Sequence, residues 1–209
     1  MFKKIRIFKI MLIKVLAILL FISAVADFGS YALVKMGKSN LSVSNIYFVV
    51  QFFLLSYIYY LLPNNKKIIY IALIFFTVFY IINTLFIQPI TIDQNWSNFV
   101  GGVLIFIYSM SYYLKLLDNM PTTNIFSFHL FWFNTAIFYY FGASVLIFLC
   151  IDFVLKNIPA DEGIIIWGFH NFNNIIKNIL FAVAIYYVKT EQSEDPNNET
   201  TPDAIKNQS

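Results

Sequence analysis

Six polar side chains are concentrated within nine residues of a stretch, 164–188, that is otherwise apolar and long enough to cross a bilayer. Imidazole, amide and ammonium groups can all hydrogen-bond a ligand, whereas hydrocarbon offers them no partner. At about 100° per residue these groups cover about half of the helix circumference. We therefore expect this face to meet protein or water, and not lipid. The six residues are His170, Asn171, Asn173, Asn174, Lys177 and Asn178.

One acid, Asp27, lies deep in a second apolar stretch, 15–34. With a rise of about 1.5 Å per residue, its depth differs from that of Lys177 by about 6 Å at most, which a lysine side chain can bridge. Ionisable residues inside a membrane span are candidate functional sites. We therefore predict an Asp27–Lys177 pair beneath a polar pocket that is open to the outside.

The same depth argument places Gln51, Asn83 and His170 in the outer half of the membrane, together with Asp27. Interhelical hydrogen bonds and a buried ion pair can also hold a bundle together without any ligand, and this alternative stays open. For Gln51 and Asn83 taken singly, that structural role is the more frequent one. The candidate ligand-binding residues are Asp27, Gln51, Asn83, His170, Asn171, Asn174 and Lys177.

The composition explains why these polar groups stand out. The chain has 209 residues, of which 59% are hydrophobic and only 12% are charged, whereas a soluble domain has about 25% charged residues. Mean hydropathy is +0.70. Cys150 is the one cysteine, which excludes an intramolecular disulfide and a metal site with several cysteines. We predict an integral membrane protein without a separate globular domain.

Hydropathy predicts an all-α, polytopic transmembrane helical bundle with six spans. A basic segment, 1–14, precedes the first span, and a polar tail, 189–209, is expected to be disordered. The pair Gly101-Gly102 predicts close helix packing. Ala24-Val25-Ala26 before Asp27 is also typical of a signal-peptide cleavage site, and cleavage there would leave five spans. The predicted spans are about 15–34, 46–62, 68–87, 98–117, 128–150 and 164–188.

The basic residues predict the orientation. With six spans, most of the fourteen Lys and Arg fall on the side that holds both termini. The positive-inside rule then places both termini in the cytoplasm of a bacterium, with the protein in the inner membrane.

Motifs for catalysis or for cofactors are missing from the sequence. It contains no phosphate-binding loop, no dinucleotide fingerprint and no nucleophile elbow. No His, Asp and Glu residues have metal-ligand spacing. His129 and His170 differ in depth by about 24 Å, so they cannot share one haem iron. We predict no enzyme, no metal, no cofactor and no nucleic-acid partner.

Three aromatic and polar clusters in the last two spans carry a family resemblance. The pattern resembles an uncharacterised family of small bacterial polytopic membrane proteins with six or seven spans, which is similar to the membrane sensor regions of some histidine kinases. Family members often carry Glu near the positions of Asp27 and Gln51. The clusters are Phe131-Trp132-Phe133-Asn134, Tyr139-Tyr140-Phe141-Gly142 and Trp167-Gly168-Phe169-His170-Asn171 with Asn174-Ile175.

The resemblance implies a sensory role. We therefore expect a membrane sensor or accessory protein, with an outward-facing polar pocket inside the membrane. Its partners would be the lipid bilayer and either a signalling protein or further copies of the chain. The alternative is a small transporter or an ion- or proton-conducting protein, for which only Asp27, His170 and Lys177 are titratable groups within the spans.

Overall fold

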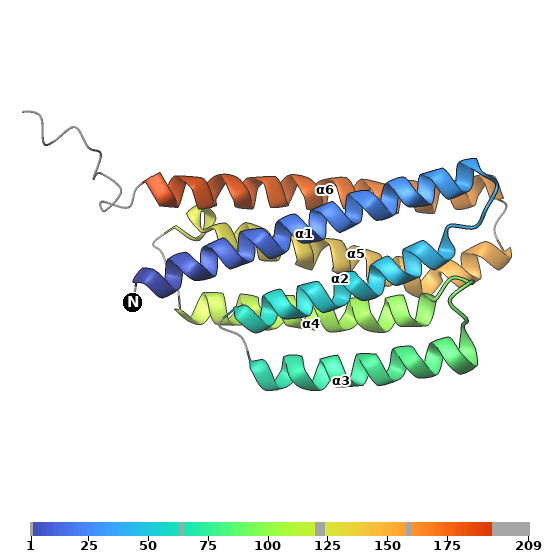
Figure 1. The fold of residues 1–209 in the computed structure, drawn as a ribbon, viewed down its shortest axis with the longest axis horizontal. Coiled ribbons are helices and arrows are strands. Elements are labelled where there is room, and N and C mark those ends of the chain that lie inside the picture. Colours follow the sequence, from blue (N-terminus) through green and yellow to red (C-terminus); the bar gives the residue numbers. More distant parts are fainter. Residues whose placement is uncertain (1, 63–64, 120–123, 158–159, 194–209) are drawn as a thin grey trace, which may run out of the picture.

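The computed structural model describes residues 2–62, 65–119, 124–157 and 160–193, and every regular element in these ranges is helical (Figure 1). The all-α prediction is therefore confirmed for the part of the chain that is described. The elements are α1 (Phe2–Lys35), α2 (Leu41–Leu61), α3 (Lys66–Ile82), a π-helical turn η1 (Asn83–Ile87), α4 (Asn95–Asn119), a 3-10 turn η2 (Ile125–Ser127), α5 (His129–Asn157) and α6 (Ala160–Ser193).

Five helices in the described ranges are long and apolar enough to cross a membrane. They correspond to the first five predicted spans. The sixth helix, α6, has 34 residues but is not among the five, since its described part carries the polar groups from His170 to Asn178. Its crossing stays a prediction. The five segments are Met11–Lys35, Leu41–Leu61, Lys66–Ile87, Asn95–Asp118 and His129–Leu149.

The helices extend beyond several of the predicted spans. From Phe2 onward the basic segment is the first part of α1, and α5 continues to Asn157. The first residues of the predicted tail, 189–193, belong to α6, and the rest of the tail lies outside the described residues. An apolar window locates the part of a helix that suits hydrocarbon, whereas the backbone hydrogen bonds continue past it.

The helices form one elongated bundle (Figure 1). The start of α1 and the end of α6 lie at the same end of it, and the α1–α2 connection lies at the opposite end. Packing is most extensive along α5, which contacts both α4 and α6, while α1 packs chiefly against α2. Helix α3 lies at the edge, against α2 and α4. The bundle thus consists of an α1–α2 pair and an α4–α5–α6 group, joined by contacts between α2 and α4.

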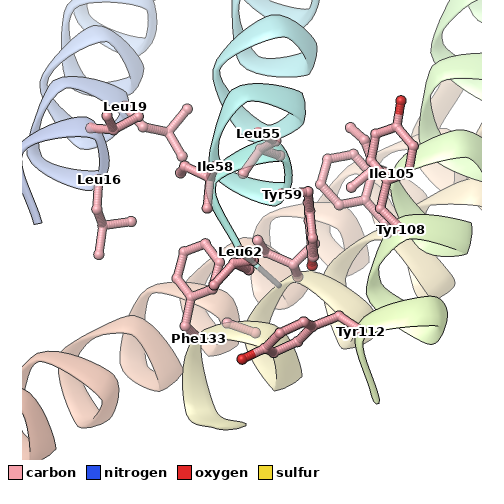
Figure 2. Close-up of a cluster of buried hydrophobic side chains, with 14 of the residues drawn as sticks. Leu16, Leu19, Leu55, Ile58, Tyr59, Leu62, Ile105, Tyr108, Tyr112 and Phe133 are labelled. Carbon is pink, nitrogen blue, oxygen red and sulfur yellow. The ribbon is translucent and has the colours of Figure 1, made fainter. Parts of the chain in front are cut away.

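An apolar cluster packs between the helices, and Figure 2 shows part of it, where α1, α2, α4 and α5 meet. It combines aliphatic side chains of α1 and α2 with aromatic side chains of α2, α4 and α5. Tyr59, Ile105 and Phe133 are among its fully buried members, each with at most 1% of its surface exposed. The labelled residues of the cluster are Leu16, Leu19, Leu55, Ile58, Tyr59, Leu62, Ile105, Tyr108, Tyr112 and Phe133.

Gly101 and Gly102 allow α4 to approach its neighbours closely, as their sequence predicts. A Cβ atom on Gly101 would lie 2.7 Å from the ring of Phe48 and 2.8 Å from the ring of Phe76. A Cβ atom on Gly102 would lie 3.0 Å from the side chain of Val145. Side chains at these two positions would therefore push α4 away from α2, α3 and α5.

The variant Gly101→Ala should lower the stability of the folded protein. The added methyl group collides with two buried rings, and overpacking of this kind costs about 1–3 kcal/mol. The matched control is Gly29→Ala in α1, where an added Cβ meets nothing within 4 Å and alanine is the better helix former. In detergent, the melting temperature should fall for Gly101→Ala and stay level or rise for Gly29→Ala. Equal melting temperatures would show that the rings can move aside.

Candidate functional site

A cavity of about 490 Å³ borders the apolar cluster, and Phe48 and Tyr140 belong to both. Side chains of α1, α2, α4, α5 and α6 line it, together with the segment before α4. Its apolar lining residues are Leu41, Phe48, Ile147 and Phe148. Its polar lining residues are Ser23, Asp27, Ser30, Asn40, Ser44, Tyr47, Gln51, Asp93, Asn95, Asn98, Tyr140, His170, Asn171 and Asn174.

Helical spacing brings these polar groups onto the faces that line the cavity. On α1, Ser23, Asp27 and Ser30 follow one another at i, i+4 and i+7, which places them on one face. On α2, Ser44 and Gln51 are also seven residues apart, so they lie above one another. Both stripes face the cavity, because all five of these residues line it, and His170, Asn171 and Asn174 of the polar stripe on α6 line it as well.

Five of the seven candidate residues line this one cavity, although they come from three helices. Asp27 lies on α1 and Gln51 on α2, and His170, Asn171 and Asn174 lie on α6. The remaining two candidates, Asn83 and Lys177, are not part of the lining.

Lys177 is buried, with 5% of its surface exposed, and its Nζ atom lies 4.3 Å from the centroid of the Tyr140 ring. Tyr140 itself lines the cavity. Lys177 and Asp27 interact electrostatically. Among the described residues, however, no direct salt bridge joins them. Lys177 lies almost one helical turn beyond Asn174 along α6, so the Tyr140 ring, and not the Asp27 carboxylate, is its close partner.

His170 lies where α5 and α6 meet at the cavity. Its ring centroid is 5.7 Å from that of Tyr140 and 5.9 Å from that of Phe148. Its Nε2 atom is 3.4 Å from the Tyr140 hydroxyl group. Tyr140 thus contacts both basic residues of the polar stripe on α6.

Asn83 belongs to a separate polar network that fixes the segment between η1 and α4. Its Nδ2 atom donates to the Gln88 side-chain oxygen at 3.2 Å and to Ser97 Oγ at 2.8 Å. Gln94 Nε2 donates to Thr84 Oγ1 at 2.9 Å and to the backbone oxygen of Gln88 at 2.8 Å. Asn83 is completely buried, and we assign it a structural role.

Asn45 extends this network to α2. Its side-chain nitrogen donates to the backbone oxygens of Ile90 and Ile92, at 2.9 and 2.6 Å. Its side-chain oxygen accepts from the Gln94 backbone nitrogen at 3.4 Å. The network therefore ties the loop to the start of α2, next to the cavity.

Asn134 forms a second hydrogen-bond network, where α2, α4 and α5 meet. Its Oδ1 atom accepts from Tyr59 Oη at 2.7 Å and from Ser109 Oγ at 2.9 Å. Its Nδ2 atom donates to the Ser109 backbone oxygen at 3.1 Å. All three residues are fully buried, so this network joins α2, α4 and α5 as interhelical hydrogen bonds do in membranes.

The cavity residues differ from these networks in one respect. Asp27, Gln51, Asn171 and Asn174 make no side-chain hydrogen bond to any described residue, although Gln51 has only 3% of its surface exposed. Asp27 and Asn171 are exposed and Asn174 is partly buried, whereas a polar side chain as buried as that of Gln51 loses free energy unless it finds a partner. These groups therefore face space that water or a ligand can fill.

Several lining residues were not among the predicted candidates. Ser23 and Ser30 could have been found from their spacing around Asp27, and Ser44 from its spacing to Gln51. Asp93 and Asn95 lie just before and at the start of α4, where hydropathy indicates only a polar loop. No sequence signal shows that this loop reaches the cavity.

The described residues contain no group of three or more His, Cys, Asp or Glu side chains that could hold a metal ion. No family model, no curated protein and no solved structure matches the chain. The family resemblance and its sensory role therefore stay predictions.

Two substitutions distinguish structural from site asparagine and glutamine residues. Asn134→Ala removes three interhelical hydrogen bonds, which are worth about 0.6 kcal/mol each on average in membrane proteins and at most about 1.7. We expect a loss of about 1–3 kcal/mol and a clear fall in melting temperature. Gln51→Met keeps the side-chain length and removes no hydrogen bond to a described residue, so its melting temperature should equal or exceed that of the wild type. A lower melting temperature for Gln51→Met than for Asn134→Ala would mean that Gln51 holds the bundle together.

Proposed function

We propose that this chain is a membrane sensor or accessory protein that binds a small polar ligand in the cavity and transmits the binding event to a partner. The observation that supports this proposal is a cavity of about 490 Å³ into which Asp27, Gln51 and Asn174 bring polar side chains that make no hydrogen bond to a described residue, whereas the Asn134 side chain in the same bundle makes three. Ligand pockets typically measure about 300–1,000 Å³ and contain a few convergent polar groups.

The arrangement of the helices suits the transmission of a signal. The cavity is lined both by the α1–α2 pair and by α5 and α6 of the other group. A ligand that contacts both favours the relative placement in which both sets of contacts form. Helices α1 and α6 have 34 residues each, and both continue from the cavity to the opposite end of the bundle (Figure 1). A shift at the cavity would reach a partner there.

The alternative, a transporter or a proton-conducting protein, needs a polar path across the whole bundle. Here the apolar cluster occupies the part of the bundle that contains Leu16, Tyr59 and Phe133 (Figure 2). This part of the bundle is largely apolar, and its buried Asn134 side chain is engaged in hydrogen bonds to Tyr59 and Ser109, which favours a binding site over a conducting path.

We place the protein in the bacterial inner membrane, with both termini in the cytoplasm and the cavity toward the outside. The start of α1 and the end of α6 lie at one end of the bundle, and the cavity lies toward the other. The excess of Lys and Arg on the side of the termini supports this orientation.

Cysteine labelling tests both the access to the cavity and its side. In a Cys150→Ser background, we expect Asn174→Cys to react in intact cells with a charged thiol reagent that does not cross membranes. Ala136→Cys is the control, since Ala136 has no exposed surface and should stay unlabelled. Labelling of Asn174→Cys only after permeabilisation would place the cavity toward the cytoplasm. No labelling under either condition would contradict an accessible site.

The cavity also requires α1 to remain whole across the Ala26–Asp27 bond. Ser23 and Asp27 line the cavity from the same helix, and cleavage between residues 26 and 27 would separate them. The intact mass of the protein purified from membranes should therefore include residues 1–26. A mass that begins at Asp27 would remove the α1 side of the proposed site.

A further inference from the structure

We infer that the cavity opens sideways into the bilayer, between α1 and α6, and that the polar group it binds is the head of an amphiphile whose apolar chain lies outside the bundle. This inference rests on the proposed function, because it assumes that the cavity is a ligand site. It adds the class of the ligand and the route by which the ligand enters.

The boundary between α1 and α6, which we call the seam, is not closed by helix packing. Both helices line the cavity. Yet α1 packs chiefly against α2 and α6 against α5, and among the described residues α1 and α6 are not a closely packed pair. Asp27 of α1 interacts electrostatically with Lys177 of α6 and is exposed. Asp27 therefore lies at the seam, on the side of α1 that is turned toward α6.

On α6, a line of amides continues from the cavity to the outer surface. Asn171, Asn174 and Asn178 follow one another at i, i+3 and i+7, which places them on one flank of the helix. The first two line the cavity, whereas Asn178 does not and is nevertheless exposed. The Asn178 side chain makes no hydrogen bond to a described residue. Its exposed surface thus lies outside the cavity, and the polar flank of α6 reaches the outside of the bundle.

The surface beside this polar line suits hydrocarbon. Phe172 and Ile175 on α6 have 55% and 58% of their surface exposed, and Phe28, next to Asp27 on α1, has 74%. Asp27 itself lies in Met11–Lys35, a segment apolar enough to cross a membrane. Lipid chains that contact these apolar side chains border the seam, and they offer no hydrogen bond to an exposed carboxylate or amide.

An amphiphile meets both requirements of the seam. The Asp27 carboxylate accepts hydrogen bonds, and the amides of Gln51 and Asn174 both donate and accept them, so a head with donors and acceptors can bind all three lining residues. The attached chain would pass out between α1 and α6 and contact the exposed apolar side chains. A ligand without a chain would fill the cavity and leave the seam in contact with hydrocarbon.

Two thiol reagents test the route into the cavity, with full-length Asn174→Cys in a Cys150→Ser background and in phosphatidylcholine nanodiscs. A charged methanethiosulfonate stays in water, whereas N-dodecylmaleimide, itself an amphiphile, is held in the bilayer by its chain. We expect Asn174→Cys to react with both, as followed by intact mass. Phe172→Cys, on the exposed apolar face, is the positive control for N-dodecylmaleimide. Ala136→Cys, at a position without exposed surface, should react with neither.

A matched pair of tryptophan variants locates the entrance. Asn178 and Ile179 are adjacent and both exposed, but Ile179 lies about 100° further around the helix. In the Asn174→Cys protein, Asn178→Trp should slow N-dodecylmaleimide several-fold and leave the charged reagent unaffected, because the ring blocks the seam and not the opening to water. Ile179→Trp should slow neither. If Asn178→Trp does not fold, Ala24→Trp serves instead, since Ala24 is exposed and lies three residues before Asp27.

The outcomes separate this inference from the proposed function. Reaction of Asn174→Cys with the charged reagent but not with N-dodecylmaleimide would overturn the lateral opening and leave the proposed function standing. Slowing by both tryptophan variants, or by neither, would place the entrance elsewhere and overturn it as well. Disulfide-linked dimers of Asn178→Cys on oxidation of native membranes would also overturn it, since a second copy would then cover the seam. Failure of both reagents at Asn174→Cys would overturn the proposed function too.

Discussion

Buried polar groups need partners in a bilayer, because hydrocarbon cannot replace the hydrogen bonds of water. In this bundle the constraint separates two kinds of polar residue. Asn83 and Asn134 are completely buried, and the side chain of each makes two or more hydrogen bonds. Gln51 is nearly as buried and makes none to a described residue. Residue type and exposure are alike, so the presence of a partner is what distinguishes a structural amide from one that faces a site.

The depth of a residue could be predicted from sequence, whereas its direction around the bundle could not. Helical rise placed Asp27, Gln51, Asn83 and His170 in one layer, and three of these four line the same cavity. Asn83 does not, because it lies at the end of α3, a helix at the edge of the bundle. Depth along a helix follows from local geometry, but the neighbours of a helix depend on contacts between distant segments.

Lys177 illustrates the same limit at shorter range. Its position on the polar face of α6 and its burial follow from periodicity, and the structure places it at 5% exposure. The identity of its partner, Tyr140, could not be predicted from periodicity. The chain has 24 Phe and 14 Tyr, and aromatic residues are too frequent around Tyr140 to single one out. The all-α fold class, by contrast, could be predicted, because it depends on the composition and mean hydropathy of whole segments and not on single side-chain contacts.

Lys177 also connects the cavity with the apolar cluster. Burial of an ammonium group costs several kcal/mol of solvation free energy, and a desolvated cation–π contact of the kind made with Tyr140 offsets about 2 kcal/mol or more of it. The rest must come from other charges, and the Asp27 carboxylate interacts with Lys177 electrostatically without touching it. A ligand bound beside Asp27 would change this attraction. Lys177 lies on α6 next to the apolar cluster, to which Phe181 and Ala184 belong. Occupation of the cavity would therefore change the forces on α6, which continues from the site to the end of the bundle where a partner would bind.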